Sequence, residues 1–162
     1  MTSDEIGQLK NRLFQKECYL LESRAALAAA MVEHFGEEAE AVLRNFLKNS
    51  VRNWAVKTAE ADLAANKPND IPGLMDFLWG PLREEGFEFT CDQTDQGYQM
   101  NVTRCPIAEI ARSRGLEKWG YIFHCMGDEA IAEGYNPAIG MTRTKMLMNG
   151  DEYCNHFYFY RE

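Results

Sequence analysis

The hydrophobic and polar positions of this chain change their period once, near the middle. Between about residues 4 and 65 there is no proline, alanine is abundant, and apolar residues such as Leu13, Leu27 and Met31 recur at helical spacing. This pattern predicts two long helices. Gly36 marks the boundary between them, because glycine commonly ends a helix.

A turn-rich stretch at residues 66–70 interrupts the helical pattern. The sequence then predicts a shorter helix from Ile71 to Glu85, with Pro72 near its start. Gly80-Pro81 is the point where this helix is expected to bend or divide, since proline cannot continue the hydrogen-bond ladder of a helix interior.

From residue 86 onward, apolar and polar residues alternate, which is typical of half-buried strands. One hairpin is predicted over residues 87–104, and a second from Ile139 to Leu147 and from Tyr153 to Arg161. Helices are predicted in between, and they run from Pro106 to about Ser113 and from about Glu117 to Glu133.

These elements predict an α+β fold, with long N-terminal helices followed by an antiparallel sheet of about four strands and intervening helices. Helices packed on one face of the sheet would leave the other face to solvent or to a partner subunit. We expect a single domain over residues 1–162, in which a helical part covers about 4–85 and a sheet-containing part about 86–162.

Charge and composition narrow the classes of function. With 25 acidic and 17 basic residues the net charge is -8, which argues against nucleic acid or an anionic membrane surface as the main partner. The first ten residues lack the apolar core of a signal peptide, and no apolar run approaches the ~20 residues of a membrane span. We therefore expect a cytoplasmic protein whose five scattered cysteines are free thiols.

Candidate chemistry begins near the C-terminus with Cys154-Asn155-His156, which lies in an aromatic-rich strand. Alternation places Cys154 and His156 on one face, where an imidazole can lower the pKa of a neighbouring thiol. The alternative is a buried thiol beside a hydrogen-bonded surface histidine.

Further candidates come from the preceding helix and strand. Tyr121, Cys125 and Asp128 are spaced to share one face of a continuous helix, although Asp128 would also suit a solvated position. Arg143 and Lys145 share one face of the penultimate strand. We expect Lys145 to point to solvent, whereas Arg143 can hold a carboxylate through its planar fork.

The C-terminal string EGYNPAIGMTRTKMLMNGDEYCNHFYF resembles the signature of the L-2-amino-thiazoline-4-carboxylic acid hydrolase family. That signature combines an Asn-Pro turn, an Arg-Thr-Lys strand, a Gly-Asp turn and a Cys-x-His strand. The resemblance extends upstream to Cys105-Pro106 and to Cys125 and Asp128. The Gly-Asp-x-x-Cys ending is also similar to that of 4-vinyl reductase type domains, which bind small molecules.

The resemblance implies a hydrolase that opens a small carboxylated cyclic amidine or thiazoline-like ring by breaking a C–N bond. In that hypothesis Cys154, or a water activated by His156, attacks the amidine carbon, while Asp128 pairs with the amidinium and Arg143 anchors the carboxylate. Cys125 would complete the catalytic set. Residues predicted to contact the substrate are Arg143, Asn136 and Tyr121.

Two other interpretations stay open. In one, the protein is a non-catalytic sensor domain that binds a small molecule or a metal. For a metal, four side chains would form an acceptable set of zinc ligands: Cys125, Asp128, Cys154 and His156. In the other, the long amphipathic helices serve a structural or oligomerising role, which allows a homo-oligomer.

Overall fold

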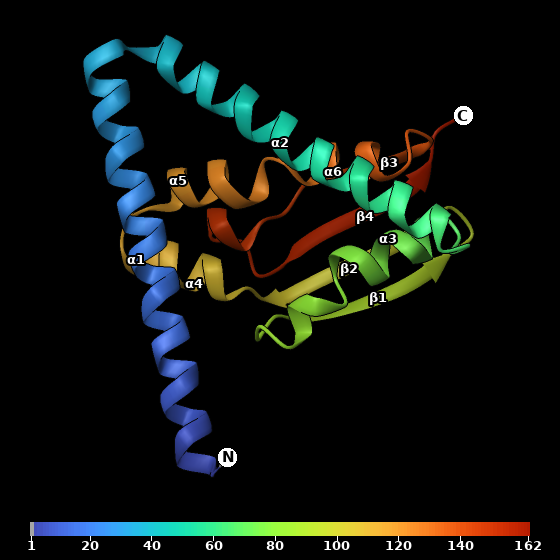
Figure 1. Ribbon diagram of the computed structural model, residues 1–162, viewed down its shortest axis with the longest axis horizontal. Coiled ribbons are helices and arrows are strands. Elements are labelled where there is room, and N and C mark those ends of the chain that lie inside the picture. The colour runs from blue at the N-terminus through green and yellow to red at the C-terminus, as the bar shows by residue number, and fades with distance from the viewer. Residues whose placement is uncertain (1) are drawn as a thin grey trace.

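The computed structural model describes residues 2–162, apart from the side chains of Ser3, Asp4 and Lys10. It confirms the predicted α+β architecture, in which two long helices precede a four-stranded antiparallel sheet with helices in between (Figure 1). Among the described residues, no helix combines the length and the apolar character needed to cross a bilayer.

The two long helices are α1 (Ser3–Phe35) and α2 (Glu37–Ala64). α1 begins with a capping box, in which the Thr2 hydroxyl accepts a hydrogen bond from the backbone N–H of Glu5 and the Glu5 carboxylate accepts one from the N–H of Thr2. Gly36 separates the helices as predicted, with a φ of 78° that favours glycine.

The third helical segment divides where the sequence predicted. α3 (Ile71–Leu78) begins with the Asp70 carboxylate accepting a hydrogen bond from the N–H of Gly73, at 2.9 Å. The chain then leaves the α-helix before the short 3-10 turn η1 (Pro81–Arg83). This break lies within the site, because Leu78, Trp79, Leu82 and Phe87 on its two sides line the same cavity as residues of the sheet.

The sheet has the strand order β1-β2-β4-β3, and every neighbouring pair is antiparallel. β1 and β2 form the predicted first hairpin, whereas β4 inserts between β2 and β3. The strands are β1 (Glu88–Thr94), β2 (Gly97–Arg104), β3 (Ile139–Arg143) and β4 (Cys154–Tyr160).

The second hairpin is shorter than predicted. β3 ends at Arg143 because the Asn155 side-chain oxygen accepts hydrogen bonds from the N–H groups of Thr144 and Lys145, at 3.0 and 2.6 Å. Lys145 therefore lies outside the strand, with its ammonium 4.5 Å from the centre of the Tyr153 ring. The connection continues through the 3-10 turn η3 (Leu147–Asn149) before β4 begins.

The single helix predicted for residues 117–133 is also wrong, since the structure divides it. A π-helical turn, η2 (Tyr121–Cys125), follows the short helix α5 (Glu117–Gly120), and the N–H of Met126 donates to the carbonyl of Tyr121 at 2.9 Å. A separate helix, α6 (Asp128–Tyr135), then begins. The extra residue of a π-turn changes the helical register, so the predicted common face does not run unbroken from Tyr121 to Asp128.

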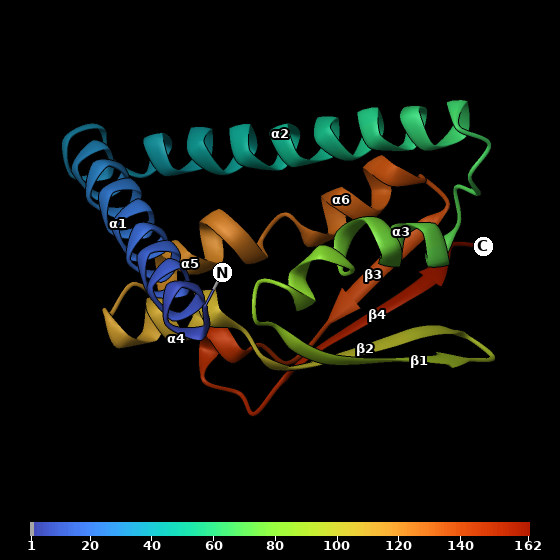
Figure 2. The same cartoon turned by 60° about the horizontal axis from the view of Figure 1, so that its bottom comes forward.

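Helices cover one face of the sheet, as predicted (Figure 2). α3 and α6 lie against the sheet, and α2 packs across α6 on the outside. The remaining helix, α4 (Pro106–Ser113), lies with α5 beside α1.

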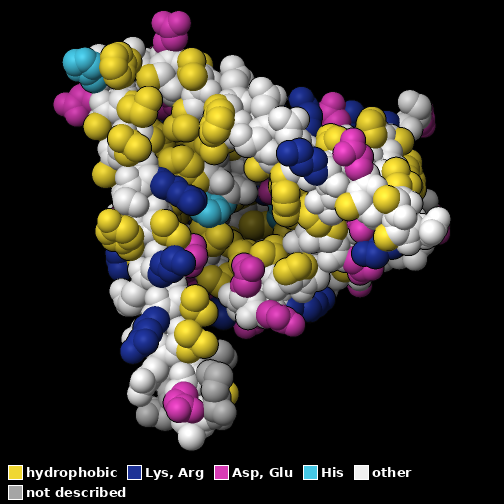
Figure 3. Space-filling view, in the orientation of Figure 1, with side chains coloured by type: hydrophobic (Ala, Val, Ile, Leu, Met, Phe, Trp, Pro, Cys, Tyr) yellow, Lys and Arg dark blue, Asp and Glu magenta, His cyan; other side chains and the backbone are white. Residues whose placement is uncertain are grey.

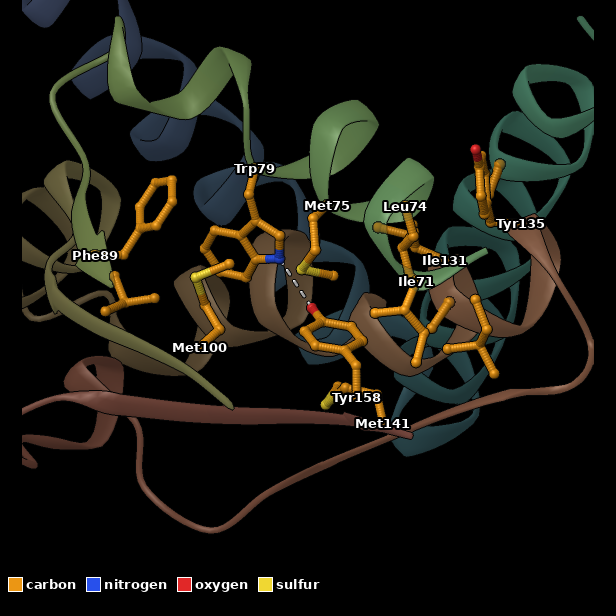
Figure 4. Close-up of a cluster of buried hydrophobic side chains, with 14 of the residues drawn as sticks. Ile71, Leu74, Met75, Trp79, Phe89, Met100, Ile131, Tyr135, Met141 and Tyr158 are labelled. Carbon is orange, nitrogen blue, oxygen red and sulfur yellow. Dashed lines mark hydrogen bonds between the residues drawn. The ribbon is translucent and has the colours of Figure 1, made fainter. Parts of the chain in front are cut away.

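The core between sheet and helices is mainly apolar, with one buried polar link. The indole N–H of Trp79 donates to the hydroxyl of Tyr158 at 3.1 Å, which ties α3 to β4 (Figure 4). Along β4 the burial alternates, so Cys154, His156 and Tyr158 face the core.

Candidate functional site

A cavity of about 200 Å³ opens at the inner face of the sheet. Most of its wall is apolar, and a few polar or ionisable groups gather on it, which is the usual composition of a small-molecule site. The lining residues are Leu78, Trp79, Leu82, Phe87, Val102, Cys105, Ile107, His124, Cys125, Asp128, Ile131, Arg143, Met148, Cys154 and His156.

A cluster of three ionisable side chains, Asp128, Arg143 and His156, forms the polar part of this wall. Arg143 Nη1 lies 2.5 Å from Asp128 Oδ2 and 2.8 Å from His156 Nε2. His156 Nε2 lies 3.3 Å from the same Asp128 oxygen. Arg143 Nη2 donates to the backbone carbonyl of Cys125 at 3.0 Å.

The strand register and the start of α6 assemble this cluster. Arg143 and His156 are directly opposed across β3 and β4, so their side chains project from the same face. Asp128 is the first residue of α6, where a carboxylate is favoured by the helix dipole. The side chains of Arg143, Asp128 and His156 expose only 9%, 16% and 3% of their area, so their interactions are weakly screened by water.

The geometry also indicates where the proton of His156 resides. Arg143 is always a donor, so a 2.8 Å contact between its Nη1 and His156 Nε2 requires Nε2 to accept. In the neutral ring the proton then lies on Nδ1. Among the described residues His156 Nδ1 has no hydrogen-bond partner although it is buried, so it is a candidate donor to a bound ligand.

Three thiols, those of Cys105, Cys125 and Cys154, line the same cavity. Burial raises the pKa of Cys105 to about 11, and burial also raises the pKa values of Cys125 and Cys154. The expectation that His156 lowers the pKa of Cys154 is therefore wrong. The Cys154 sulfur instead accepts a hydrogen bond from the N–H of Leu147 at 3.2 Å, and desolvation outweighs that stabilisation of the thiolate.

His124 and Trp79 are lining residues that contact or carry ionisable groups and that were not assigned a role in the sequence-predicted site. His124 reaches the cavity because the π-turn rotates it, and burial, with the nearby Arg24 charge, lowers its pKa to about 4. Trp79 meets the His156 ring in an edge-on contact with centroids 5.0 Å apart. No local signal reveals Trp79, since it lies 77 positions before His156 and only the packing of α3 on the sheet joins them.

The structure brings together Cys125, Asp128, Arg143, Cys154 and His156, but it does not bring Asn136 or Tyr121 to the lining of this cavity. The Asn136 amide donates to the carbonyl of Asn69 at 2.6 Å, and its oxygen accepts from the N–H of Ala138. Asn136 thus holds a turn, as its Asn-Pro context allows.

Tyr121 packs with the apolar side chains that join α1, α4 and α5. The π-turn accounts for this placement, because it rotates the side chains before Met126 relative to those of α6.

The four residues of the predicted zinc set are not arranged as the ligands of one metal ion. In the part of the chain that the structure describes, no three His, Cys, Asp or Glu side chains are grouped closely enough to hold a metal ion. The Asp128 carboxylate is instead bound by the Arg143 guanidinium, whose positive charge opposes a cation at the same position. The residues as arranged do not fit a zinc ion.

A cavity whose wall carries a buried Asp–Arg–His cluster, on this α+β fold, is a candidate small-molecule site. The model of the L-2-amino-thiazoline-4-carboxylic acid hydrolase family matches residues 11–158, and the chain belongs to this family. No curated protein matches the chain.

Several solved structures share the fold, among them a sensory domain and a subunit of a trafficking complex. One is the phenol-responsive sensory domain of the transcription activator PoxR with phenol, at 12% identity and a TM-score of 0.53, covering 86% of this chain and 74% of that one. The other is a trafficking protein particle complex subunit 3 from Naegleria fowleri, covalently bound to palmitic acid, at 8% identity and a TM-score of 0.53, covering 91% of this chain and 96% of that one.

Proposed function

We propose that this protein hydrolyses a small carboxylated cyclic amidine, of the 2-amino-thiazoline-4-carboxylate type, in the cavity lined by Asp128, Arg143 and His156. The observation that carries the proposal is the buried cluster of these three side chains on an otherwise apolar wall, in a chain of this hydrolase family. Buried and mutually paired ionisable groups in a cavity are the usual signature of acid-base chemistry.

The size of the cavity supports a small substrate. Its volume of about 200 Å³ lies below the roughly 300–1,000 Å³ of sites for drug-sized ligands. A five-membered ring with two substituents is of a suitable size, and the apolar side chains of the wall would exclude bulk water around it.

The polar groups of the cluster match the charges of such a substrate. Arg143 and His156 both contact Oδ2 of Asp128, which leaves Oδ1 to pair with the N–H groups of an amidinium. The three contacts of Arg143 use three of its five N–H groups, and the other two can bind the substrate carboxylate.

In the proposed reaction, water adds to the amidine carbon and the C–N bond to the ring nitrogen breaks. Asp128 accepts one proton from the attacking water and returns it to the departing ring nitrogen, and the remaining hydroxyl proton of the tetrahedral intermediate ends on the released amine as the C=O bond forms. His156 Nε2 keeps accepting from Arg143, and the Nδ1–H of His156 donates a hydrogen bond to the oxygen of the intermediate. This water route is favoured over attack by Cys154, because burial raises the pKa of that thiol and so disfavours the nucleophilic thiolate.

The test is turnover of L-2-amino-thiazoline-4-carboxylic acid by the purified protein, followed by mass spectrometry as the addition of one water. Asp128→Asn and His156→Leu are each expected to lower kcat by at least ~100-fold, because the first removes the base and the second removes the buried hydrogen-bond donor. Arg143→Lys is expected to raise KM more than it lowers kcat, since lysine cannot form the planar fork. Glu129→Gln is the matched control, because Glu129 is adjacent to Asp128 but exposed and outside the cavity.

Folding of each variant is checked by circular dichroism, so that lost activity is not confused with lost structure. Wild-type protein that turns over neither this substrate nor a carboxylated imidazoline analogue contradicts the proposal. Full activity in a folded Asp128→Asn protein would exclude the proposed mechanism but would still support the proposed hydrolase function.

A second candidate function is a non-catalytic small-molecule sensor. The predominantly apolar wall and the shared fold with a phenol-responsive sensory domain favour it. Calorimetric titration with phenol and with the thiazoline separates the two functions. Binding of either compound without turnover assigns the protein to the sensor class.

A further inference from the structure

α1 carries an apolar stripe that its own chain leaves exposed. Ile6, Leu13, Leu20 and Leu27 follow one another at intervals of seven residues, and Leu9 lies between the first two. Ile6, Leu9, Leu13 and Leu27 expose 42%, 47%, 53% and 66% of their area. This repeat matches one of the two apolar positions in the seven-residue pattern of a left-handed coiled coil, whereas the second position, which begins at Leu9, continues with the polar Lys16 and Ser23.

This stripe is distinct from the face by which α1 packs on the rest of the molecule. The buried side chains of α1 are Cys18, Leu21, Ala25 and Ala28, which contact the residues of α4 and α5. At 100° per residue, the centre of the stripe lies roughly 100° around the helix from that buried face. The stripe is therefore a second apolar surface and no extension of the core.

The N-terminal half of α1 extends beyond the rest of the molecule (Figure 1). From Thr2 to Glu17 every side chain that the structure describes is exposed. Isolated helices of this length are marginal in water, so most helices depend on tertiary packing for stability. A partner along the stripe would supply that packing.

We propose that the stripe pairs with α1 of a second copy of this chain, antiparallel, to form a two-fold symmetric dimer. A repeating Ile and Leu stripe is complementary to itself, which is what a two-fold interface requires. Hydrophobic side chains run along α1 and gather near its bend with α2, so the apolar surface continues past the helix end (Figure 3).

The length of the stripe suits a stable dimer. A helix of 33 residues is about 50 Å long, so a contact about 10 Å wide would bury on the order of 500 Å² on each chain. Phe35, at the end of α1, exposes 67% of its area and extends the surface. The two chains together would bury about 1,000 Å², which is at the lower end of the range for a specific interface.

Charge distribution favours the antiparallel orientation. The bend carries the exposed side chains of Glu33, Glu37 and Glu38, whereas the exposed charges that the structure describes between residues 2 and 17 balance, Glu5 and Glu17 against Arg12 and Lys16. Parallel helices would place the two acidic bends side by side. Antiparallel helices instead bring each acidic bend toward a stretch with no net charge.

Light scattering coupled to size exclusion tests the dimer, with the full chain expected at twice its 18.6 kDa mass. Leu13→Lys is expected to raise the dissociation constant of the dimer by at least ~100-fold. The two-fold symmetry places one lysine from each copy in the apolar contact between the stripes. The matched control is Tyr19→Lys, an equally drastic change on the same helix at a side chain that is 69% exposed but off the stripe. It is expected to leave the dimer intact.

Cross-linking tests the orientation, in protein that carries Cys91→Ser to remove the exposed native thiol. Antiparallel pairing places Leu9 close to Met31 of the other copy, whereas the two Leu9 positions lie roughly 30 Å apart along the helix. A short bismaleimide should therefore join a mixture of Leu9→Cys and Met31→Cys proteins, but neither protein alone.

Several outcomes would overturn the proposal. They are a monomeric wild-type protein at micromolar concentration, a dimer that Leu13→Lys leaves unchanged, or a dimer that Tyr19→Lys disrupts equally. Cross-linking of Leu9→Cys protein to itself would overturn the antiparallel arrangement. A monomer that sediments with phospholipid vesicles would assign the stripe to a membrane surface and not to a second copy.

Discussion

Removing the Asp128 carboxylate is expected to destabilise this protein far more than removing an ordinary ion-pair partner. In Asp128→Ala, the guanidinium of Arg143 keeps its contacts to the Cys125 carbonyl and to His156 but loses the only carboxylate within 4 Å among the described residues. Because the Arg143 side chain is only 9% exposed, water cannot readily replace that carboxylate.

The magnitude follows from the burial of the pair. Breaking a buried pair from one side costs about 3–5 kcal/mol, because the remaining charge is uncompensated. Asp128 retains 16% exposure and a backbone carbonyl still binds Arg143, so we expect the lower end, about 3 kcal/mol of unfolding free energy. At about 2.1 cal/mol/K per residue, a chain of 162 residues would lose about 9 °C in Tm.

The assay is urea unfolding followed by tryptophan fluorescence, with Glu133→Ala as the matched control. Glu133 pairs with Arg52 at 2.5 Å, but the two side chains are 37% and 40% exposed. An exposed pair of this kind contributes at most about 1 kcal/mol, so the control should change little.

A double-mutant cycle with Arg143→Met isolates the interaction. The double variant is expected to be more stable than the sum of the two single effects implies, by about 2 kcal/mol, because both charges are gone. The reasoning fails if Asp128→Ala costs less than about 1 kcal/mol, or if the two single effects simply add.

Three further predictions concern buried groups. Tyr158→Phe should lower the free energy of unfolding, measured in urea, by about 1–3 kcal/mol, because it leaves the buried Trp79 N–H unpaired. A decrease below about 0.5 kcal/mol would contradict this. Burial lowers the pKa of His124 from 6.5 to about 4, so the unfolded chain binds the proton first as the pH falls. The stability that this shift contributes is complete above pH 6.5 and should fall by about 3 kcal/mol as the pH approaches 4. His124→Gln should flatten this part of the stability profile, and an unchanged profile would refute the assignment. Iodoacetamide at neutral pH should label the exposed Cys91 before Cys154, as judged by peptide mass spectrometry, and the reverse order would show that Cys154 is more accessible or more ionised than the structure implies.

Much of the fold was predictable because it depends on local hydrogen bonds. The long helices, their boundary at Gly36, and the first hairpin all follow from a period of apolar residues and a turn residue within a few positions of one another. The same is true of the break before Pro81, since proline acts on its own neighbours.

The sequence misjudged elements whose ends depend on distant partners. β3 stops at Arg143 because the Asn155 side chain, on another strand, accepts hydrogen bonds from the backbone that follows. The helix predicted over residues 117–133 contains a π-turn, which hydrophobic spacing did not reveal.

For the site, the sequence by itself determined that Cys154 and His156 share one face of β4, since alternation alone places them together. Only the tertiary structure decided that β3 pairs with β4 in a register that opposes Arg143 and His156, and that Asp128 joins them. It also decided the properties of the thiols. Alternation depends on one strand, whereas desolvation depends on every segment packed around a group, and burial therefore raised the pKa of Cys154 where its sequence neighbour alone suggested a lower value.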